Sequence, residues 1–269
     1  MTEPLALTKY QALGNDYLVL DLPADLGAVL PAVPRLCSRH LGLGADGLLL
    51  FDAERLAIRI FNPDGSEAEK SGNGLRIGAC HAVLDHGAPE EFELAAGGRA
   101  HPVRVLEAAG PEVVSELDIG TPSLPVAGWV ELDTPVGPAR CRLVELGNPH
   151  CVVFGEPVTE ERCRELGPHL ERHPRFPNRT NVQLAEAPDR SLARAEIWER
   201  GAGYTLASGT SAAAVAAACM DLDLVGPEVR VRMPGGTLQL RRNGAGHLLQ
   251  TGPARRVYRA EVAPEDLEG

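Results

Sequence analysis

The chain has 269 residues, of which 44% are apolar, and a formal net charge of −11. This negative charge argues against a nucleic acid or an anionic membrane as a partner. The N-terminus lacks the basic-then-apolar pattern of a signal peptide, and no run of 18 apolar residues predicts a membrane span. The six cysteines include no C-x-x-C pair, so we expect reduced thiols, no metal site and a cytoplasmic protein.

The first half of the chain alternates strand and helix patterns. Apolar residues alternate on both sides of Gly14-Asn15-Asp16, which predicts two strands and a tight turn over 5–21. Helical spacing predicts one helix over 28–39 and another over 75–86. Further apolar runs predict strands over 48–51, 56–61, 91–94, 103–106 and 113–117.

The second half of the chain repeats this order. The turn Gly147-Asn148-Pro149-His150 lies between two apolar runs, as Gly14-Asn15-Asp16 does in the first half. The expected elements are strands over 143–146 and 151–154, a helix over 160–171, and final strands over 229–233, 238–241, 248–251 and 257–262.

Two stretches, 59–79 and 196–216, align without a gap and place Ser71 on Ser208. In both halves the Gly-Asn turn precedes the serine by a nearly equal interval. The same landmarks in the same order at similar spacing indicate an internal duplication. A proline-rich stretch divides the two copies, and the expected domains are 1–120, completed by 256–269, and 121–255.

Each of the two serines precedes a helical pattern. A helix start has unpaired N–H groups and a partial positive charge, so it binds anions well. Two such starts could hold one carboxylate and stabilise negative charge that develops on the adjacent α-carbon. Serine is also a common helix N-cap, so Ser71 or Ser208 alone would need no function. Their gapless pairing favours two halves of one active site.

The chain resembles the diaminopimelate epimerase family over nearly its whole length. Eight motifs occur in the order of that family. They are Gly14-Asn15-Asp16, Gly42-Leu43-Gly44-Ala45-Asp46-Gly47, Phe61-Asn62-Pro63-Asp64-Gly65-Ser66-Glu67, Gly72-Asn73-Gly74, Gly147-Asn148-Pro149-His150, Arg179-Thr180-Asn181, Glu199-Arg200-Gly201-Ala202-Gly203 and Gly209-Thr210.

The resemblance implies an isomerase of lysine biosynthesis that interconverts LL- and meso-diaminopimelate without a cofactor. It implies an α+β fold of two pseudo-symmetric domains, each a curved, mostly antiparallel sheet around a central helix. It also suggests a homodimer that acts on a small-molecule amino acid. The α-carboxylate would bind at Gly72, Asn73, Gly209 and Thr210, and the remote end of the substrate at Asn15, Asn62, Asn148, Asn181 and Arg200.

The chain departs from the family at the two proton-transfer positions. The family uses two cysteines, where this sequence has Ser71 and Ser208. A thiol with a pKa of about 8.5 is readily shifted to a thiolate, whereas a serine hydroxyl needs a neighbouring base. His150 and Glu199 match the residues that neighbour the thiols, and either is a candidate base. In addition, Lys70 precedes Ser71, and Tyr204 replaces an acidic residue.

Three functions remain open at this point. The first is an epimerase or racemase with an altered mechanism. The second is a lyase or isomerase that acts on a related amino acid with His150 or Glu199 as its base. The third is a binding protein that retains the carboxylate site without turnover. A Ser-His-Glu hydrolase is disfavoured, because no G-x-S-x-G motif is present.

Overall fold

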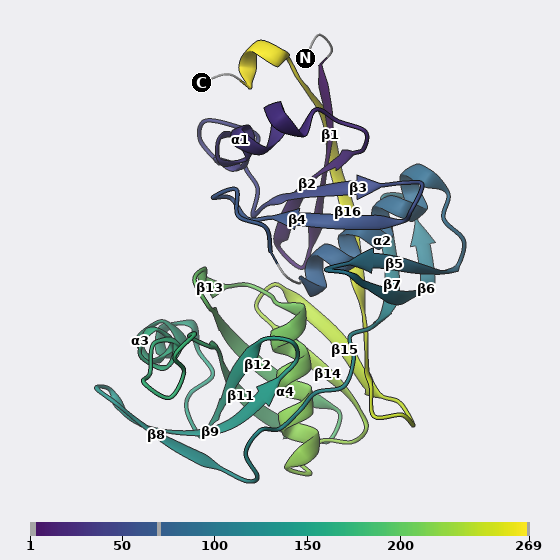
Figure 1. Ribbon diagram of the computed structural model, residues 1–269. Helices are drawn as coiled ribbons and strands as arrows, with labels where there is room; N and C mark the ends of the chain where they lie inside the picture. The colour runs from purple at the N-terminus through teal and green to yellow at the C-terminus, as the bar shows by residue number, and fades with distance from the viewer. Residues whose placement is uncertain (1–3, 69–70, 268–269) are drawn as a thin grey trace. The chain divides into compact units, whose positions relative to one another are not determined.

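The computed structural model describes residues 4–68 and 71–267 (Figure 1). The chain forms two compact units. Unit 1 combines the chain up to Leu117 with the segment from Gly252 onward, and unit 2 is Asp118–Thr251. Among the described residues, no helix combines the length and apolar character that crossing a bilayer requires.

Unit 1 is a sheet closed on itself. The strand order is β1-β2-β3-β4-β5-β6-β7-β16, and β16 pairs again with β1. Two pairs, β2–β3 and β4–β5, are parallel, and the helices α1 and α2 connect them. The elements are β1 (Leu5–Ala12), β2 (Asn15–Asp21), α1 (Leu26–Cys37), β3 (Leu48–Asp52), β4 (Ala57–Phe61), α2 (Gly72–His86), β5 (Glu91–Ala96), β6 (Arg99–Ala109), β7 (Glu112–Asp118) and β16 (Leu248–Val262).

Unit 2 has the same plan. Its strand order is β16-β15-β14-β12-β11-β10-β9-β8, with β13 paired to β12. The pairs β10–β11 and β12–β14 are parallel, and α3 and α4 connect them. The elements are β8 (Val130–Thr134), β9 (Gly137–Glu145), β10 (Pro149–Phe154), α3 (Glu160–Glu171), β11 (Asn181–Asp189), β12 (Leu192–Glu199), β13 (Gly203–Thr205), α4 (Gly209–Asp221), β14 (Glu228–Met233) and β15 (Gly236–Arg242).

The segment that follows β7 helps to close the sheet of unit 2. The Ile119 amide N–H donates to the Leu248 carbonyl at 3.0 Å, and the Ser123 amide N–H donates to the Glu145 carbonyl at 2.9 Å. This segment therefore bridges β16 and β9.

The predicted two-repeat fold is confirmed. Each unit contains two parallel strand pairs joined through a helix, and the remaining pairs are mostly antiparallel. One prediction is wrong, because 248–251 and 257–262 form the single strand β16. Gly252-Pro253 looks like a turn in the sequence, but it lies where β16 exchanges β15 for β1 as its partner. Proline is tolerated in a strand where no ladder hydrogen bond is lost.

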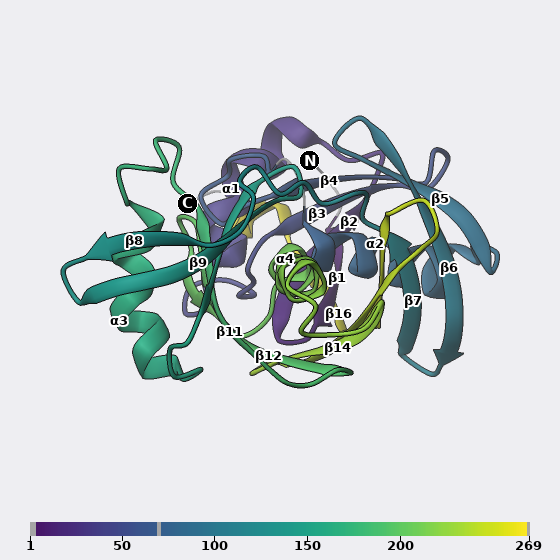
Figure 2. The same ribbon diagram turned by 90° about the horizontal axis from the view of Figure 1, so that it is seen from below.

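The helices α2 and α4 lie inside their units. Every residue of α2 from Gly72 to Ala82 is buried, as is every residue of α4 from Gly209 to Cys219. A helix without a polar face requires a protein environment on all sides. The strands provide that environment, and Figure 2 shows α4 end on with β11, β12 and β14 around it. The alanines and serine of α4 are small enough to fit within the curved sheet.

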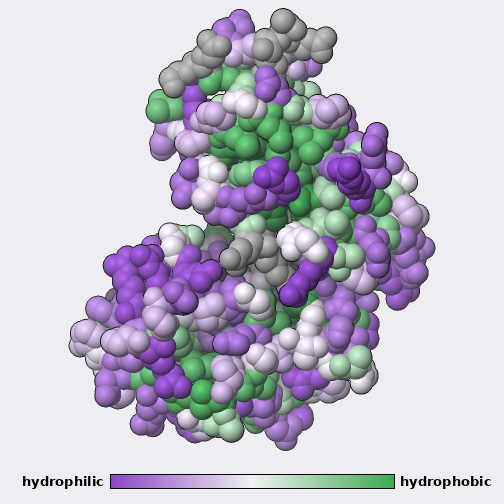
Figure 3. All heavy atoms as spheres, in the orientation of Figure 1, coloured by the Kyte–Doolittle hydropathy of each residue, from purple (hydrophilic) through white to green (hydrophobic). Residues whose placement is uncertain are grey.

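The helices α1 and α3 pack outside their sheets. In unit 1, Val29 and Val33 of α1 join an apolar cluster with Leu18 of β2. In unit 2, Leu166 of α3 joins a cluster with Leu184 of β11. Hydrophilic residues cover much of the face drawn in Figure 3. In strand β14, exposed and buried residues alternate, so one face of the strand is turned to solvent and the other to the core.

The packing of α3 on β12 predicts the effect of one substitution. An added Cβ at Gly167 would lie 2.6 Å from Cγ of Trp198, whose indole N–H donates to Glu171 at 2.7 Å. We expect Gly167→Ala to lower the free energy of unfolding by about 1–3 kcal/mol, measured by urea denaturation. Glycine to alanine inside a helix ordinarily stabilises by about 0.5–1 kcal/mol, so the predicted sign is reversed.

Gly244→Ala is the matched control. Gly244 is exposed in a turn, and nothing lies within 4 Å of an added Cβ. Its effect should stay within about 0.5 kcal/mol. A Gly167→Ala protein as stable as the wild type would contradict the packing described here.

Candidate active site

Ser71 caps the start of α2. Its backbone is extended, with φ −140° and ψ 118°, and the Gly74 amide N–H donates to its Oγ at 3.0 Å. The hydroxyl therefore satisfies one N–H of the helix start and can donate its own hydrogen elsewhere. The preceding Lys70, noted in the sequence, lies outside the described residues.

Ser208 caps the start of α4 in the same way. Its φ is −144° and its ψ is 130°, and the Ser211 amide N–H donates to its Oγ at 3.4 Å. Ser208 is buried, with 3% of its surface exposed. The aligned serines of the two repeats thus have nearly identical local structure, and each stands at the positive end of a buried helix.

Hydrogen bonds connect the first hairpin to the start of α2. The Asn73 side-chain amide donates to Oδ1 of Asn15 at 3.0 Å, and the Asn15 amide donates to Asp46 at 2.8 Å. The buried Arg76 donates to Oδ1 of Asn73 at 2.5 Å. Two predicted site residues, Asn15 and Asn73, are therefore brought together. Asp46, which belongs to the glycine-rich motif over 42–47, and Arg76 support them; neither was predicted as a site residue.

An ion-pair cluster fixes the hairpin against the glycine-rich loop. Arg39 donates to both oxygens of Asp16, at 3.1 and 2.8 Å, and to Asp46 at 2.7 Å. Lys9 lies 2.7 Å from Asp16. Burial would raise the pKa of Asp16, but the hydrogen bonds and charges of Arg39 and Lys9 lower it to about 2. Asp16 is therefore ionised at neutral pH, and the turn that carries Asn15 is held from two sides.

Asn62 lies in a separate turn after β4. Its side-chain amide donates to Oγ of Ser66 at 3.0 Å, and Asp64 accepts from the Ser66 amide N–H at 2.9 Å. At the base of the turn, Arg59 forms a bidentate pair with Glu67, at 2.9 and 2.8 Å. Asn62 thus makes its side-chain contact within its own turn and not with Asn15.

The His150 imidazole is buried and neutral. Its Nδ1 accepts from the Gln183 amide at 3.2 Å, which places the ring hydrogen on Nε2, where it donates to Oδ1 of Asn148 at 2.9 Å. Burial is the main cause that lowers the pKa of His150 to about 3; the contact with Gln183 opposes this effect, and the charge of Arg200 adds slightly to it. Because its lone pair already accepts a hydrogen bond, this histidine is suited to position Asn148 and not to remove a proton.

Gln183 connects His150 to the start of α4. Its amide also donates to Oγ of Ser211 at 3.0 Å, and the Ser211 amide N–H donates to Ser208. A polar chain therefore runs from Asn148 to Ser208. We did not identify Gln183 from the sequence. It lies two positions after Asn181 on β11 and so shares a face of the strand with it, which is the available sequence signal.

The loop that carries Arg200 is anchored by buried polar groups. The Asn181 side chain donates to the Pro149 carbonyl at 3.0 Å and accepts from the Arg200 amide N–H at 3.0 Å. The buried Glu171 carboxylate accepts from the Gly201 amide N–H at 3.0 Å. The exposed Arg200 guanidinium then extends from a fixed backbone, and half-buried Glu199 ends β12 beside it.

Tyr204 belongs to the packing of α3. Its hydroxyl donates to Glu196 at 2.7 Å, and the Arg164 guanidinium lies 4.4 Å from the centre of its ring. Its contacts are therefore with α3 and the opposite face of β12 from Glu199, since positions 196 and 199 alternate.

The cysteines do not supply the thiols that the serines replace. All six are free and buried. Burial raises the pKa of Cys80 and of Cys219 to about 12, so neither forms a thiolate at neutral pH.

Comparisons with known proteins identify similar chains. The sequence model of the family described as Diaminopimelate epimerase matches residues 7–121 and 142–257. Diaminopimelate epimerase 2 of a Nostoc species is 40% identical, covering 96% of this chain and 95% of that protein. The diaminopimelate epimerase of Desulforudis audaxviator is 39% identical, covering 94% and 98%.

Two solved structures share the fold. A phenazine biosynthesis protein of the PhzF family from Bacillus anthracis has a TM-score of 0.70 at 14% identity, covering 97% of this chain and 99% of that one. A hydroxyproline epimerase from Agrobacterium vitis, with bound trans-4-hydroxy-L-proline, has a TM-score of 0.69 at 18% identity, covering 97% and 93%. At these identities the likeness supports the fold alone.

The neutral His150 predicts a pH dependence of stability. An unfolded histidine has a pKa of about 6.5, above the folded value of about 3. The stability that comes from keeping His150 neutral is therefore complete above about pH 6.5 and is lost as the pH falls towards about 3. Between about pH 7 and pH 5 this loss lowers the free energy of unfolding by about 2 kcal/mol. Urea unfolding of His150→Gln should show a loss about 2 kcal/mol smaller over that interval than the wild type.

His40→Gln, at an exposed position, is the control and should follow the wild type. Equal pH dependence in the His150→Gln and wild-type proteins would show that folding does not lower the pKa of the imidazole.

Proposed function

Because this chain belongs to the diaminopimelate epimerase family, we propose that it interconverts LL- and meso-diaminopimelate by moving the α-proton without a cofactor. The observation that carries this proposal is the match of both repeats to the family, together with two helix starts that are capped alike by Ser71 and Ser208. On this assignment the chain is an isomerase of amino-acid metabolism.

We assign the α-carboxylate to the two helix starts. Positions Gly72 and Asn73 begin α2, and Gly209 and Thr210 begin α4. The burial of both helices supports this assignment, because a helix dipole acts more strongly on a charge that water does not screen. The same field would stabilise the negative charge that develops when the α-proton leaves.

We assign the remote amino-acid end of the substrate to amide and guanidinium groups. The proposed residues are Asn15, Asn62, Asn148, Asn181 and Arg200. Support comes from their anchoring, since Asn15, Asn148 and Asn181 are each held by at least one hydrogen bond that fixes the side chain. An exposed guanidinium on a fixed loop can bind a carboxylate through two parallel hydrogen bonds.

The proton transfer differs from that of a thiol pair. A serine hydroxyl does not rest as an anion, so we propose that Ser71 and Ser208 donate and relay protons on the two faces of the α-carbon. Of the two candidate bases, Glu199 is favoured, because the lone pair of His150 accepts from Gln183 and the lowered pKa of the imidazole makes it a poor proton acceptor. His150 is then a positioning residue that orients Asn148.

One observation favours a second function, binding without turnover. Both proton-transfer positions are serines, and burial raises the thiol pKa of Cys80 and Cys219 far above neutrality. Such a protein would bind diaminopimelate at the same groups and would not exchange its α-proton.

The homodimer and the cytoplasmic location belong to the same proposal. Six buried free thiols are typical of a reducing compartment. The dimer rests on the family resemblance.

Restoring the thiols should raise the rate. We expect the Ser71→Cys/Ser208→Cys double variant to interconvert LL- and meso-diaminopimelate with a kcat/KM about 10²–10⁴-fold above that of the wild type, since positioned acid–base groups contribute this much. Chiral chromatography of the stereoisomers measures it. Ser123→Cys, which adds a thiol at an exposed position, is the control and should leave the rate unchanged.

If the double variant neither binds nor converts either stereoisomer, the substrate assignment is wrong. Binding without conversion in both the wild type and the double variant would instead support the second function.

Glu199→Gln tests the assigned base. We expect it to slow exchange of the α-proton in deuterated water by about 10²-fold or more, followed by NMR, because an amide cannot accept the proton. Glu196→Gln is the matched control on the opposite face of β12 and should exchange at the wild-type rate. If Glu199→Gln exchanged the α-proton at the wild-type rate, the base would be a group other than Glu199.

A further inference from the structure

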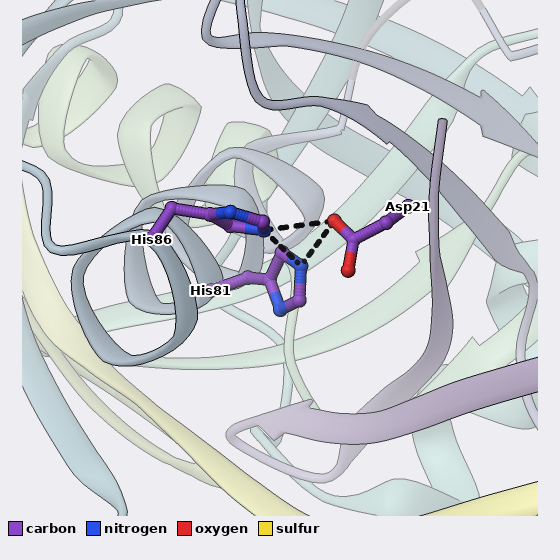
Figure 4. A group of neighbouring side chains, drawn as sticks. All are labelled: Asp21, His81 and His86. Carbon is purple, nitrogen blue, oxygen red and sulfur yellow. Dashed lines mark hydrogen bonds and ion pairs between the residues drawn. The ribbon is translucent and has the colours of Figure 1, made fainter. Parts of the chain in front are cut away.

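Three side chains of unit 1 point their ligand atoms at one another near the end of α2. Asp21 ends β2, and His81 and His86 lie on α2 (Figure 4). Oδ1 of Asp21 lies 2.9 Å from Nε2 of His81 and 2.8 Å from Nε2 of His86, and the two Nε2 atoms are 3.3 Å apart. Among the described residues, these three form a group of metal-ligand atoms within 4.8 Å of one another.

The His81 ring is fixed by groups behind it. Its Nδ1 lies 3.0 Å from the Tyr10 hydroxyl and 3.2 Å from Oδ2 of Asp85. The Tyr10 hydroxyl donates to the same Asp85 carboxylate, so Nδ1 must carry the ring hydrogen. The other oxygen of Asp85 accepts from Arg256 at 3.0 Å and from Arg259, which holds the carboxylate in place. A carboxylate behind a histidine is the usual support of a metal ligand.

An aromatic ring fixes both imidazoles. Phe51 stacks on His86, with ring centres 5.0 Å apart and an interplanar angle of 16°, and meets His81 edge to face, with centres 4.9 Å apart. His81 is almost fully buried, at 1% exposure, whereas His86 and Asp21 are partly exposed. The ligand atoms are therefore held in position on a side that solvent can reach.

In this arrangement two hydrogen-bond acceptors, Nε2 of His81 and the Asp21 carboxylate, face each other without a hydrogen between them. With the hydrogen of His81 on Nδ1, its Nε2 presents a lone pair to the Asp21 carboxylate at 2.9 Å. His86 relieves part of this repulsion if its Nε2 hydrogen points between them. A cation bound by Oδ1 of Asp21 and by Nε2 of both histidines would remove this repulsion, because each of these atoms would point a lone pair at the ion.

We propose that Asp21, His81 and His86 bind a divalent transition-metal ion of the zinc class. Two imidazole nitrogens and a carboxylate oxygen suit such an ion. Ligands at about 2.0–2.1 Å from a tetrahedral ion are about 3.4 Å apart, so the three atoms need only small movements outward. The site has three protein ligands, and its fourth position takes water or a small anion.

A cavity gives access to that fourth position. It has a volume of about 620 Å³, and Thr8, Arg259 and Glu261 line it together with the three ligands. The metal site is remote from the start of α2. Helix α2 has 15 residues, so His86 lies about 22 Å along the helix axis from the capped end. Metal binding there would fasten the end of β2 to the end of α2.

Titration of the full chain with Co²⁺ tests the site, because tetrahedral Co²⁺ with nitrogen and oxygen ligands has a characteristic visible absorption. We expect one Co²⁺ per chain, displaced by Zn²⁺. Asp21→Asn and His86→Gln should each weaken binding at least about ten-fold. Both positions are partly exposed, so these variants avoid the buried His81. His247→Gln is the control, since His247 pairs with Asp118 at 2.8 Å outside the three-residue cluster and its loss should leave binding unchanged.

A second readout follows from linkage. Zn²⁺ in hundred-fold excess over its wild-type Kd should raise the Tm of the wild type by roughly 5 °C, and that of His86→Gln by at most about half as much. Absence of the Co²⁺ spectrum in a folded wild-type chain, or equal binding by the wild type and both variants, would overturn the proposal. In that case a hydrogen bond from Nε2 of His81 to Asp21, and not a metal ion, would hold the three side chains together.

Discussion

The structure depends on burying the start of an α-helix inside a curved sheet. A buried helix start has N–H groups that water cannot satisfy, so the chain must supply a partner at the N-cap. Ser71 and Ser208 are those partners, in the same extended conformation in both repeats. The capped ends remain electropositive in a poorly screened environment. The motifs shared with the family and the proposed carboxylate site both include these two helix starts.

Much of this arrangement is readable from the sequence. The gapless alignment of 59–79 with 196–216 predicts the duplication, and the Ser-Gly steps predict that a central helix follows each serine; the first, predicted over 75–86, begins three residues earlier, at Gly72. Both central helices begin at the residue after the serine. The strand β16 was predicted as two pieces, because a Gly-Pro step indicates a turn unless the partner strands on each side are known.

The supporting residues of the site could not be predicted in this way. Asp46 and Gln183 contact Asn15 and His150 across segments far apart in the sequence, and Arg76 contacts Asn73 within α2. The motif over 42–47 contains Asp46, and the alternation of β11 places Gln183 on the face of Asn181, but neither pattern identifies the contact. His150 shows the same limit, since a histidine after Gly-Asn-Pro fits a catalytic base as well as a positioning group. Its burial and the Gln183 amide at its Nδ1 decide between them. The Asp21, His81 and His86 cluster is likewise created by the fold, where the end of β2 meets the end of α2.

The central claim is that two serine-capped helix starts still support α-proton transfer on diaminopimelate. The most direct measurement starts from LL-diaminopimelate in deuterated water and follows the position of deuterium in the wild-type products by NMR and mass spectrometry. We expect meso-diaminopimelate with deuterium at the inverted α-carbon, because the proton is taken from one face and returned on the other by a group that has exchanged its proton with solvent. Saturating substrate that acquires no deuterium in either stereoisomer would contradict it.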